Sequence, residues 1–161
     1  MSEQELTQEE LERLSQGFIY AIAEHEGSFR SDGVPYVSHP IRVALHALSL
    51  GMTTEAVIAA VLHDVVEDTD ISIRDVEEEF DHDIADIVAA LTKPAHGTPN
   101  RNQIYESQLL NGPEEARMIK LLDIQDNLSD VEDFLEPEAA AAYRKSREAL
   151  AQVLRASLPH P

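Results

Sequence analysis

The stretch AVIAAVLHDVVEDTD, from Ala56 to Asp70, begins as an apolar segment and continues into a run of ionisable side chains. If it forms one helix, residues four apart share a face, so His63 lies over Glu67. By the same spacing, Asp64 lies over Asp68. A charge left buried and unpaired beside such an apolar segment is strongly destabilising. We therefore expect a metal ion, or phosphate chemistry at a metal ion, to balance these groups.

Composition bounds the class of protein. The chain has 161 residues, 43% of them hydrophobic, which predicts a single globular domain over residues 1–161. It contains no cysteine, so thiolate metal sites and disulfides are excluded. The net charge of −19 and the 5% aromatic content argue against nucleic acid and anionic membranes as partners.

The ends of the chain give a further expectation. The N-terminal sequence MSEQELTQEE is acidic and polar, unlike a signal or transit peptide, and no apolar run is long enough to span a membrane. We therefore expect a cytoplasmic protein. An oligomer is possible, but nothing in the sequence specifies one.

Helix signals follow one another along the chain. A capping box at Thr7, Ser72 followed by Asp75, a cap at Ser38, and prolines at Pro113 and Pro137 mark expected helix starts. No useful length of sequence alternates as a strand does, so the expected fold class is all-α. The expected helices cover about 7–24, 38–51, 53–68, 72–80, 84–93, 101–110, 113–135 and 137–158.

Two further segments could complete a metal site. His39 follows a Gly-x-Pro loop and precedes Pro40, which fixes its side chain at a stiff helix start. Asp123 follows an apolar run, and Asn127 and Asp130 share its helix face. Each pattern alone is more often a solvated surface. Together with His63 and Asp64, however, His39 and Asp123 form a His₂Asp₂ group that suits Mn²⁺, Fe²⁺ or Zn²⁺.

A calcium loop is the competing interpretation of the acidic run. Asp68 and Glu79 fall at the first and twelfth positions of an EF-hand loop, but Ile73 replaces its essential glycine. We therefore reject a calcium loop. For the histidines outside the expected ligand group, we expect loop or surface positions, with His25 closest in sequence to the pocket: His25, His46, His82, His96 and His160.

Four segments carry a family resemblance: PYVSHP at 35–40, HDVVEDTD at 63–70, LTK at 91–93 and KLLD at 120–123. They resemble the hydrolase domain of the RelA/SpoT alarmone enzymes, within the HD-domain phosphohydrolase superfamily, and the chain length is similar to that of single-domain small alarmone hydrolases. The resemblance implies a helical bundle that holds Mn²⁺, with Zn²⁺ or Fe²⁺ possible. The ligands it implies are His39, His63, Asp64 and Asp123.

The resemblance also implies a reaction, the hydrolysis of (p)ppGpp to GDP or GTP and pyrophosphate. In that reaction Glu67 and Asp68 serve the attack of water on the 3′-pyrophosphate. Chemistry agrees, because Glu67 can orient or deprotonate water and Asp68 can assist or donate a proton. The resemblance places Arg30 and Asn127 at the nucleotide, and Lys93 and Lys120 are candidate phosphate contacts.

The chain departs from the family on the substrate side. Ser31 stands where the family usually has lysine, Asp126 where it has histidine, and Ser129 where it has arginine. Ser31 remains a candidate substrate contact. The lost cations keep another nucleotide open, such as NADPH or a nucleoside phosphate. An inactive nucleotide-binding module is a third hypothesis, which the intact Glu67 and Asp68 argue against.

Overall fold

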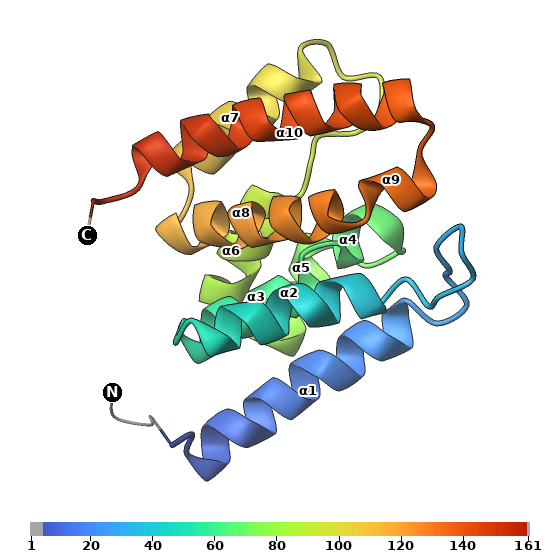
Figure 1. The fold of residues 1–161 in the computed structure, drawn as a ribbon. Helices are drawn as coiled ribbons and strands as arrows, with labels where there is room; N and C mark the ends of the chain where they lie inside the picture. The colour runs from blue at the N-terminus through green and yellow to red at the C-terminus, as the bar shows by residue number, and fades with distance from the viewer. Residues whose placement is uncertain (1–4, 161) are drawn as a thin grey trace.

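Helix α3 (Thr54–Leu62) forms the centre of the molecule (Figure 1). In the computed structural model, which describes residues 5–160, every side chain from Ala56 to Leu62 is fully buried. This burial explains the unbroken apolar sequence, because a helix enclosed on all sides needs no polar face. Contacts with α1, α2, α6 and α8 enclose it.

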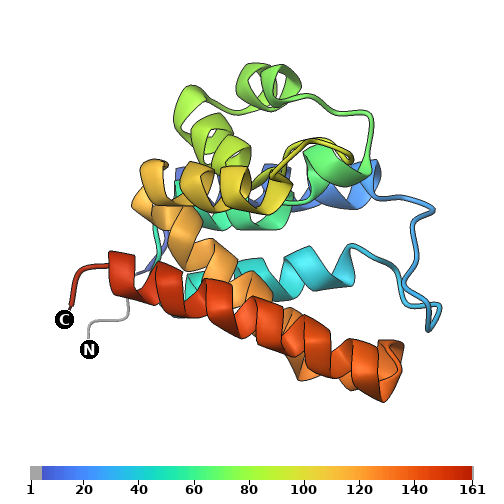
Figure 2. The same ribbon diagram turned by 90° about the horizontal axis from the view of Figure 1, so that it is seen from above.

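The other helices form a shell around α3. In Figure 1, α1 and α10 lie on opposite sides of the molecule, and Figure 2 shows α10 along one edge of it. Helix α10 packs on α7, α8 and α9. The bounds are α1 Gln8–Glu24, α2 Ser38–Ser49, α4 Val65–Asp68, α5 Ile73–Glu79, α6 His82–Leu91, α7 Arg101–Asn111, α8 Glu114–Ser129, α9 Val131–Phe134 and α10 Pro137–Ser157.

The predicted all-α class is confirmed. Residues 5–160 contain no strand, only an isolated bridge between Phe29 and Pro35. The capping box predicted at Thr7 is formed, Ser72 forms a second one with Asp75, and Thr53 caps α3. Among the described residues, no helix combines the length and apolar character needed to cross a membrane.

The single helix predicted over 53–68 is wrong, because the structure divides it into α3 and α4. Nδ1 of His63 lies 2.6 Å from the carbonyl oxygen of Ala60, and Asp64 has φ −102° and ψ −3°. A side chain that bonds the backbone competes with the helix ladder, which accounts for the break at this point. His63 and Asp64 therefore lie at a corner between helices rather than on a continuous helical face.

Several other helix boundaries differ from the expectation by a few residues; α6, for example, runs from His82 to Leu91 rather than over 84–93. Ser38 is the first residue of α2 rather than its cap, and its hydroxyl makes no capping bond. The long helix predicted to reach about Leu135 ends at Ser129, and α9 follows after Asp130. A guanidinium N–H of Arg144 in α10 donates to the carbonyl oxygen of Leu128, so a partner distant in sequence satisfies that carbonyl.

Candidate metal centre and active site

Two buried histidines point their Nε2 atoms at the same place. Nδ1 of His63 faces the Ala60 carbonyl oxygen, and Nδ1 of His39 lies 2.6 Å from Oδ2 of Asp126. A carbonyl and a carboxylate only accept hydrogen bonds, so each Nδ1 carries the proton. This leaves Nε2 of both rings for other partners. The two rings meet edge to face, with centroids 5.3 Å apart.

Asp123 and Asp64 bring carboxylate oxygens to these nitrogens. Oδ1 of Asp123 lies 2.9 Å from Nε2 of His39 and 3.4 Å from Nε2 of His63. Oδ2 of Asp64 lies 3.2 Å from Nε2 of His63 and 3.8 Å from Nε2 of His39. The four residues predicted as ligands therefore converge from α2, α8 and the corner between α3 and α4.

The cluster formed by His39, His63, Asp64 and Asp123 fits a divalent cation. Ligand atoms of His39, His63 and Asp123 lie within 4.8 Å of one another, and all three residues are buried. Nε2 of His63 is buried and has no hydrogen-bond partner among the described residues, as expected of a nitrogen reserved for a metal. Imidazole nitrogen and carboxylate oxygen are ordinary ligands of divalent transition metals.

The charges within the cluster are strongly coupled. Burial opposes protonation of His39, but its hydrogen bonds with Asp123 and Asp126 raise its pKa overall. For Asp64, burial opposes ionisation, but the attraction of nearby His63 outweighs it and lowers the pKa to about 2. Among the protein groups alone, the site thus favours anionic carboxylates beside protonated imidazoles. A cation would take the place of those protons.

Glu67 and Asp68 lie one turn beyond this corner, on α4. Oε1 of Glu67 accepts a hydrogen bond from the backbone N–H of Lys93, with 2.6 Å between the atoms. Desolvation, followed by the nearby charge of Asp64, raises the pKa of Asp68 to about 6. Asp68 is partly desolvated by its neighbours, but both residues keep solvent-accessible surface, so water and substrate can reach them.

Lys120 and Asn127, two of the predicted substrate contacts, both bond the carboxylate of Asp123. Nζ of Lys120 lies 2.6 Å from its Oδ2, and Nδ2 of Asn127 donates to Oδ1 at 2.9 Å. Lys120 is buried, yet the charge of Asp123 and the hydrogen bond with it overcome its desolvation and raise its pKa. Both residues therefore orient Asp123, in addition to any contact they make with a bound substrate.

The remaining predicted contacts lie farther out. Arg30 pairs with Asp130 at 3.0 Å, and its guanidinium stacks on Phe134 at 4.2 Å from the ring centroid. Ser31 is exposed in the turn that follows, with no side-chain hydrogen bond among the described residues. Lys93 is half-buried in the loop after α6.

The sequence-based reasoning missed two supporting residues. Tyr36 donates its hydroxyl to Oδ2 of Asp64, with 2.5 Å between the oxygens. Asp126 accepts from His39 and from Arg42, whose Nε lies 2.9 Å from Oδ1. The position of Tyr36 within the PYVSHP motif was a usable signal for the first. The second depends on the packing of α2 against α8, which sequence spacing does not reveal.

The positions of the other histidines fit the expectation in all but one case. His46, His82 and His96 are not buried, but His25 is only 2% exposed. Its ring lies 5.4 Å from that of Tyr36, and neither ring nitrogen has a hydrogen-bond partner among the described residues. Burial lowers the pKa of His25, which favours the neutral ring beside the cluster.

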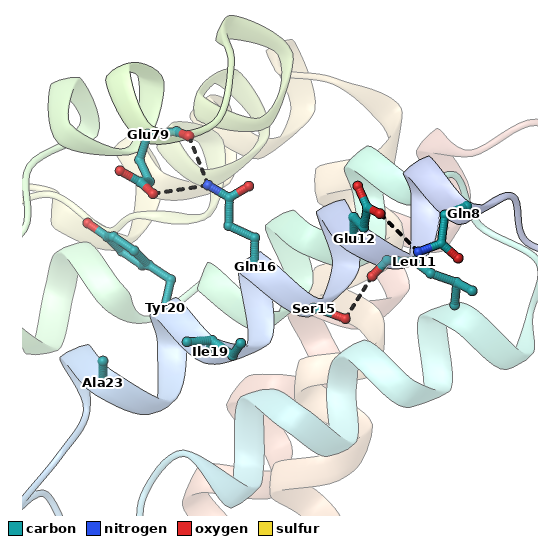
Figure 3. A pocket seen from close by; sticks show the side chains of 9 residues that line it. All are labelled: Gln8, Leu11, Glu12, Ser15, Gln16, Ile19, Tyr20, Ala23 and Glu79. Carbon is teal, nitrogen blue, oxygen red and sulfur yellow. Dashed lines mark hydrogen bonds between the residues drawn. The ribbon is translucent and has the colours of Figure 1, made fainter.

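A separate hollow of about 600 Å³ lies along α1 (Figure 3). Two pairs of its polar side chains bond each other. Gln16 donates to Oε1 of Glu79 at 3.0 Å, and Gln8 donates to Glu12 at 2.9 Å. None of the converging histidines and carboxylates lines this hollow, so the chemistry of the molecule is expected at the cluster.

A helical bundle that converges imidazole and carboxylate groups on one buried point defines a class of metal-binding helical domains. The chain belongs to the HD-domain family, whose profile matches residues 17–108. That range includes His39, His63, Asp64, Glu67 and Asp68, and Asp123 follows it along the chain.

Several relatives have descriptions that name one reaction. The chain is 33% identical over 141 residues to the guanosine-3′,5′-bis(diphosphate) 3′-pyrophosphohydrolase of Aquifex aeolicus, covering 85% of this chain and 20% of that protein. It is 38% identical over 88 residues to the bifunctional (p)ppGpp synthase/hydrolase SpoT of Escherichia coli, covering 55% of this chain and 12% of that protein. The chain thus spans a fifth or less of the length of these two relatives.

A solved structure covers nearly the whole chain. It is that of a metazoan ortholog of SpoT, described as hydrolysing ppGpp and playing a role in starvation responses. The TM-score is 0.75 at 27% identity, covering 90% of this chain and 84% of that one. The resemblance to RelA/SpoT hydrolase domains seen in the sequence is therefore confirmed, in sequence and in fold.

Proposed function

We propose that this protein hydrolyses the 3′-pyrophosphate of (p)ppGpp, releasing pyrophosphate and leaving GDP or GTP. The observation that carries the proposal is the convergence of His39, His63 and Asp123 one turn from Glu67. The relatives that bear this activity in their names support the choice of substrate.

His39, His63, Asp64 and Asp123 would hold the cation, with Mn²⁺ the expected ion and Zn²⁺ or Fe²⁺ also compatible with these ligands. A divalent cation supplies Lewis-acid chemistry here, since it neutralises phosphoryl charge and makes water more acidic. Asp126 and Tyr36 keep two of the ligands in place, through the bonds to His39 and Asp64.

Glu67 and Asp68 divide the proton transfers. Water attacks the phosphorus next to the ribose, the bond from that phosphorus to the 3′-oxygen breaks, and the 3′-oxygen needs a proton. Glu67, oriented by the Lys93 backbone N–H, accepts the proton from water. Asp68, with a pKa of about 6, keeps a protonated fraction near neutral pH and suits donation to the 3′-oxygen.

The remaining predicted contacts serve the nucleotide. Lys120 and Asn127 act mainly by orienting Asp123, to which both are bonded. Arg30 and Ser31 sit where the chain turns toward α2, and Arg30 would share its guanidinium between Asp130 and the nucleotide.

A second candidate is a different nucleotide substrate, such as NADPH or a nucleoside phosphate. Ser31, Asp126 and Ser129 replace family cations, and Asp126 is committed to His39 and Arg42. Fewer cations on the substrate side relax the preference for a substrate with two diphosphates.

A panel of ppGpp, pppGpp, NADPH and nucleoside 5′-phosphates, each with Mn²⁺ or with EDTA, separates these candidates. We expect pyrophosphate to be released from ppGpp when Mn²⁺ is present and not when EDTA is present. Turnover of NADPH alone would reject the alarmone assignment while keeping the reaction class. Binding without turnover of any nucleotide would favour the inactive module.

A further inference from the structure

Four aromatic rings lie in series between the end of α1 and the metal cluster. The ring of His25 packs on that of Tyr36, with centroids 5.4 Å apart, and the ring of Tyr36 lies 6.2 Å from that of His39. His39 in turn meets His63 at 5.3 Å. The series connects the end of α1, through Tyr36, to two of the expected ligands.

His25 is held firmly in its place. It caps α1, with its backbone nitrogen 3.1 Å from the carbonyl oxygen of Ala21, and the residue is only 2% exposed. Neither ring nitrogen has a hydrogen-bond partner among residues 5–160. The imidazole therefore acts on its neighbours through the contact surface of its ring.

Backbone hydrogen bonds join the same two residues at the start of the series. The carbonyl oxygen of His25 accepts from the N–H of Ser28 at 3.0 Å, and the carbonyl oxygen of Ser28 accepts from the N–H of Tyr36 at 2.9 Å. The bridge between Phe29 and Pro35 closes the loop that lies between them. His25 and Tyr36 are thus fixed relative to each other by the main chain as well as by their rings.

Tyr36 carries this contact to an expected ligand. Its hydroxyl donates to Oδ2 of Asp64, the oxygen that lies 3.2 Å from Nε2 of His63. The phenolic oxygen is bonded directly to the ring and moves with it. The ring of His25 limits the positions open to that of Tyr36, and so the direction from which the hydroxyl meets Asp64. Outer partners of this kind orient metal ligands and change the affinity for the ion.

We propose that His25 is a positioning residue for the metal centre, which acts through the ring of Tyr36 to orient Asp64. The assignment rests on the proposed function for the divalent cation at the cluster, but it does not depend on which nucleotide is the substrate. It gives a role to a histidine that was expected in a loop or at the surface.

A double-mutant cycle on Mn²⁺ affinity tests this role, because residues that act through one another have non-additive effects. Calorimetric titration of the EDTA-stripped protein compares the parent, His25→Ala, Tyr36→Phe and the double variant. His25→Ala should weaken Mn²⁺ binding by about 5-fold, the usual scale of an aromatic contact. When Tyr36→Phe has already removed the bond to Asp64, the same replacement should change the affinity by less than about 2-fold.

Urea unfolding of the same four proteins separates positioning from support of the fold. Because Tyr36→Phe keeps the ring, removal of His25 should lower the free energy of unfolding to a similar extent with either residue at position 36. Only the loss of Mn²⁺ affinity should depend on the hydroxyl. An equal loss of affinity with either residue at position 36 would overturn the proposal, as would parent affinity in His25→Ala.

Three further variants complete the test. His25→Phe keeps an aromatic ring against Tyr36 and should bind Mn²⁺ as the parent does, whereas a loss as large as that in His25→Ala would overturn the ring contact. If His25→Ala does not fold, His25→Val takes its place in the cycle, since a larger side chain leaves a smaller cavity. His96→Ala, at an exposed histidine in the loop before α7, is the control and should leave the affinity unchanged.

Activity on ppGpp keeps this proposal separate from the proposed reaction. If ppGpp is not hydrolysed but the replacements at His25 and Tyr36 remain coupled in Mn²⁺ affinity, the proposed reaction fails and the positioning role stands. If ppGpp is hydrolysed but the two replacements act independently, the reaction stands and the positioning role fails.

Discussion

Asp126 on α8 accepts a hydrogen bond from Nδ1 of His39 on α2, with 2.6 Å between the two atoms. This bond holds a proton on Nδ1 and turns Nε2 of His39 toward Asp123, where a cation would bind. Burial opposes ionisation of Asp126, but the bonds from His39 and Arg42 lower its pKa to about 2, so it stays anionic. A side chain that stands in place of a family histidine thus supports the metal cluster instead of contacting substrate.

Replacing Asp126 with alanine should weaken Mn²⁺ binding by about 10- to 100-fold, because a ligand without its supporting hydrogen bond loses its orientation. Calorimetric titration of the EDTA-stripped protein with Mn²⁺ measures the change. Asp86→Ala, at an exposed carboxylate on α6, is the matched control and should bind Mn²⁺ as the parent does. Equal Mn²⁺ affinity in Asp126→Ala and the parent would exclude the supporting role.

Mn²⁺ affinity should rise with pH. In the stripped protein burial opposes protonation of His39 and His63, but neighbouring carboxylates raise both pKa values. The protonated rings of His39 and His63 stabilise the fold of the metal-free protein. This stabilisation is fully present below about pH 6.5, the pKa of histidine in the unfolded chain, and it is lost as the pH rises through the pKa values of the folded protein. A cation must displace the same protons, so binding releases protons and tightens as the pH rises above about 6.5.

Titrations in two buffers of different ionisation enthalpy give the number of protons released. An affinity that stays constant over this range, with no proton release, would show that the imidazoles do not bind the ion.

Glu67→Gln should lower kcat on ppGpp by about 100-fold or more, the usual contribution of a general base. The amide keeps an oxygen for the Lys93 backbone N–H but cannot take a proton. Mn²⁺ affinity should stay at the parent value, because Glu67 is not one of the converging ligands. The control is Glu78→Gln, at an exposed residue paired with Arg74. Unchanged kcat in Glu67→Gln would remove this residue from the reaction.

Gly112→Ala should reduce the free energy of unfolding by about 1–3 kcal/mol, the usual penalty of overpacking. A Cβ there would lie 2.9 Å from Cβ of Ala90 and 3.0 Å from the carbonyl oxygen of Gln108, and neither atom can rotate away. Gly17→Ala is the comparison, because its new Cβ would meet the side chain of Ile58 at 3.1 Å. Alanine has a greater helix propensity than glycine, which offsets part of the cost of that contact. We therefore expect a smaller loss in the free energy of unfolding, measured by urea denaturation.

Local signals in the sequence predicted most of the helices. Thr7 forms a capping box as its spacing indicates, Ser72 starts α5 as expected, and Pro137 opens α10. These signals act within a few residues, so the sequence displays them directly. The two helix breaks were not predicted, because they depend on contacts that no local sequence pattern marks. Neither glycine nor proline marks the corner at Asp64 or the break at Asp130, and the competing bonds to Ala60 and Leu128 come from side chains.

The ligand set was more predictable than its surroundings. His39, His63, Asp64 and Asp123 are predicted from residue chemistry and motif, and the structure brings them together from separate elements. Arg30 was expected at the nucleotide, yet Asp130 and Phe134 hold it. The pairing depends on residues 100 positions apart in sequence, which no local pattern reports.

Pyrophosphate release from ppGpp tests the central claim most directly. Purified protein is assayed with Mn²⁺ and with excess EDTA, and the nucleotide product is identified by chromatography. The account predicts equal amounts of GDP and pyrophosphate with Mn²⁺ and neither product with EDTA. It would be contradicted by undiminished hydrolysis in EDTA, or by intact ppGpp after prolonged incubation with Mn²⁺ and protein that demonstrably binds the ion.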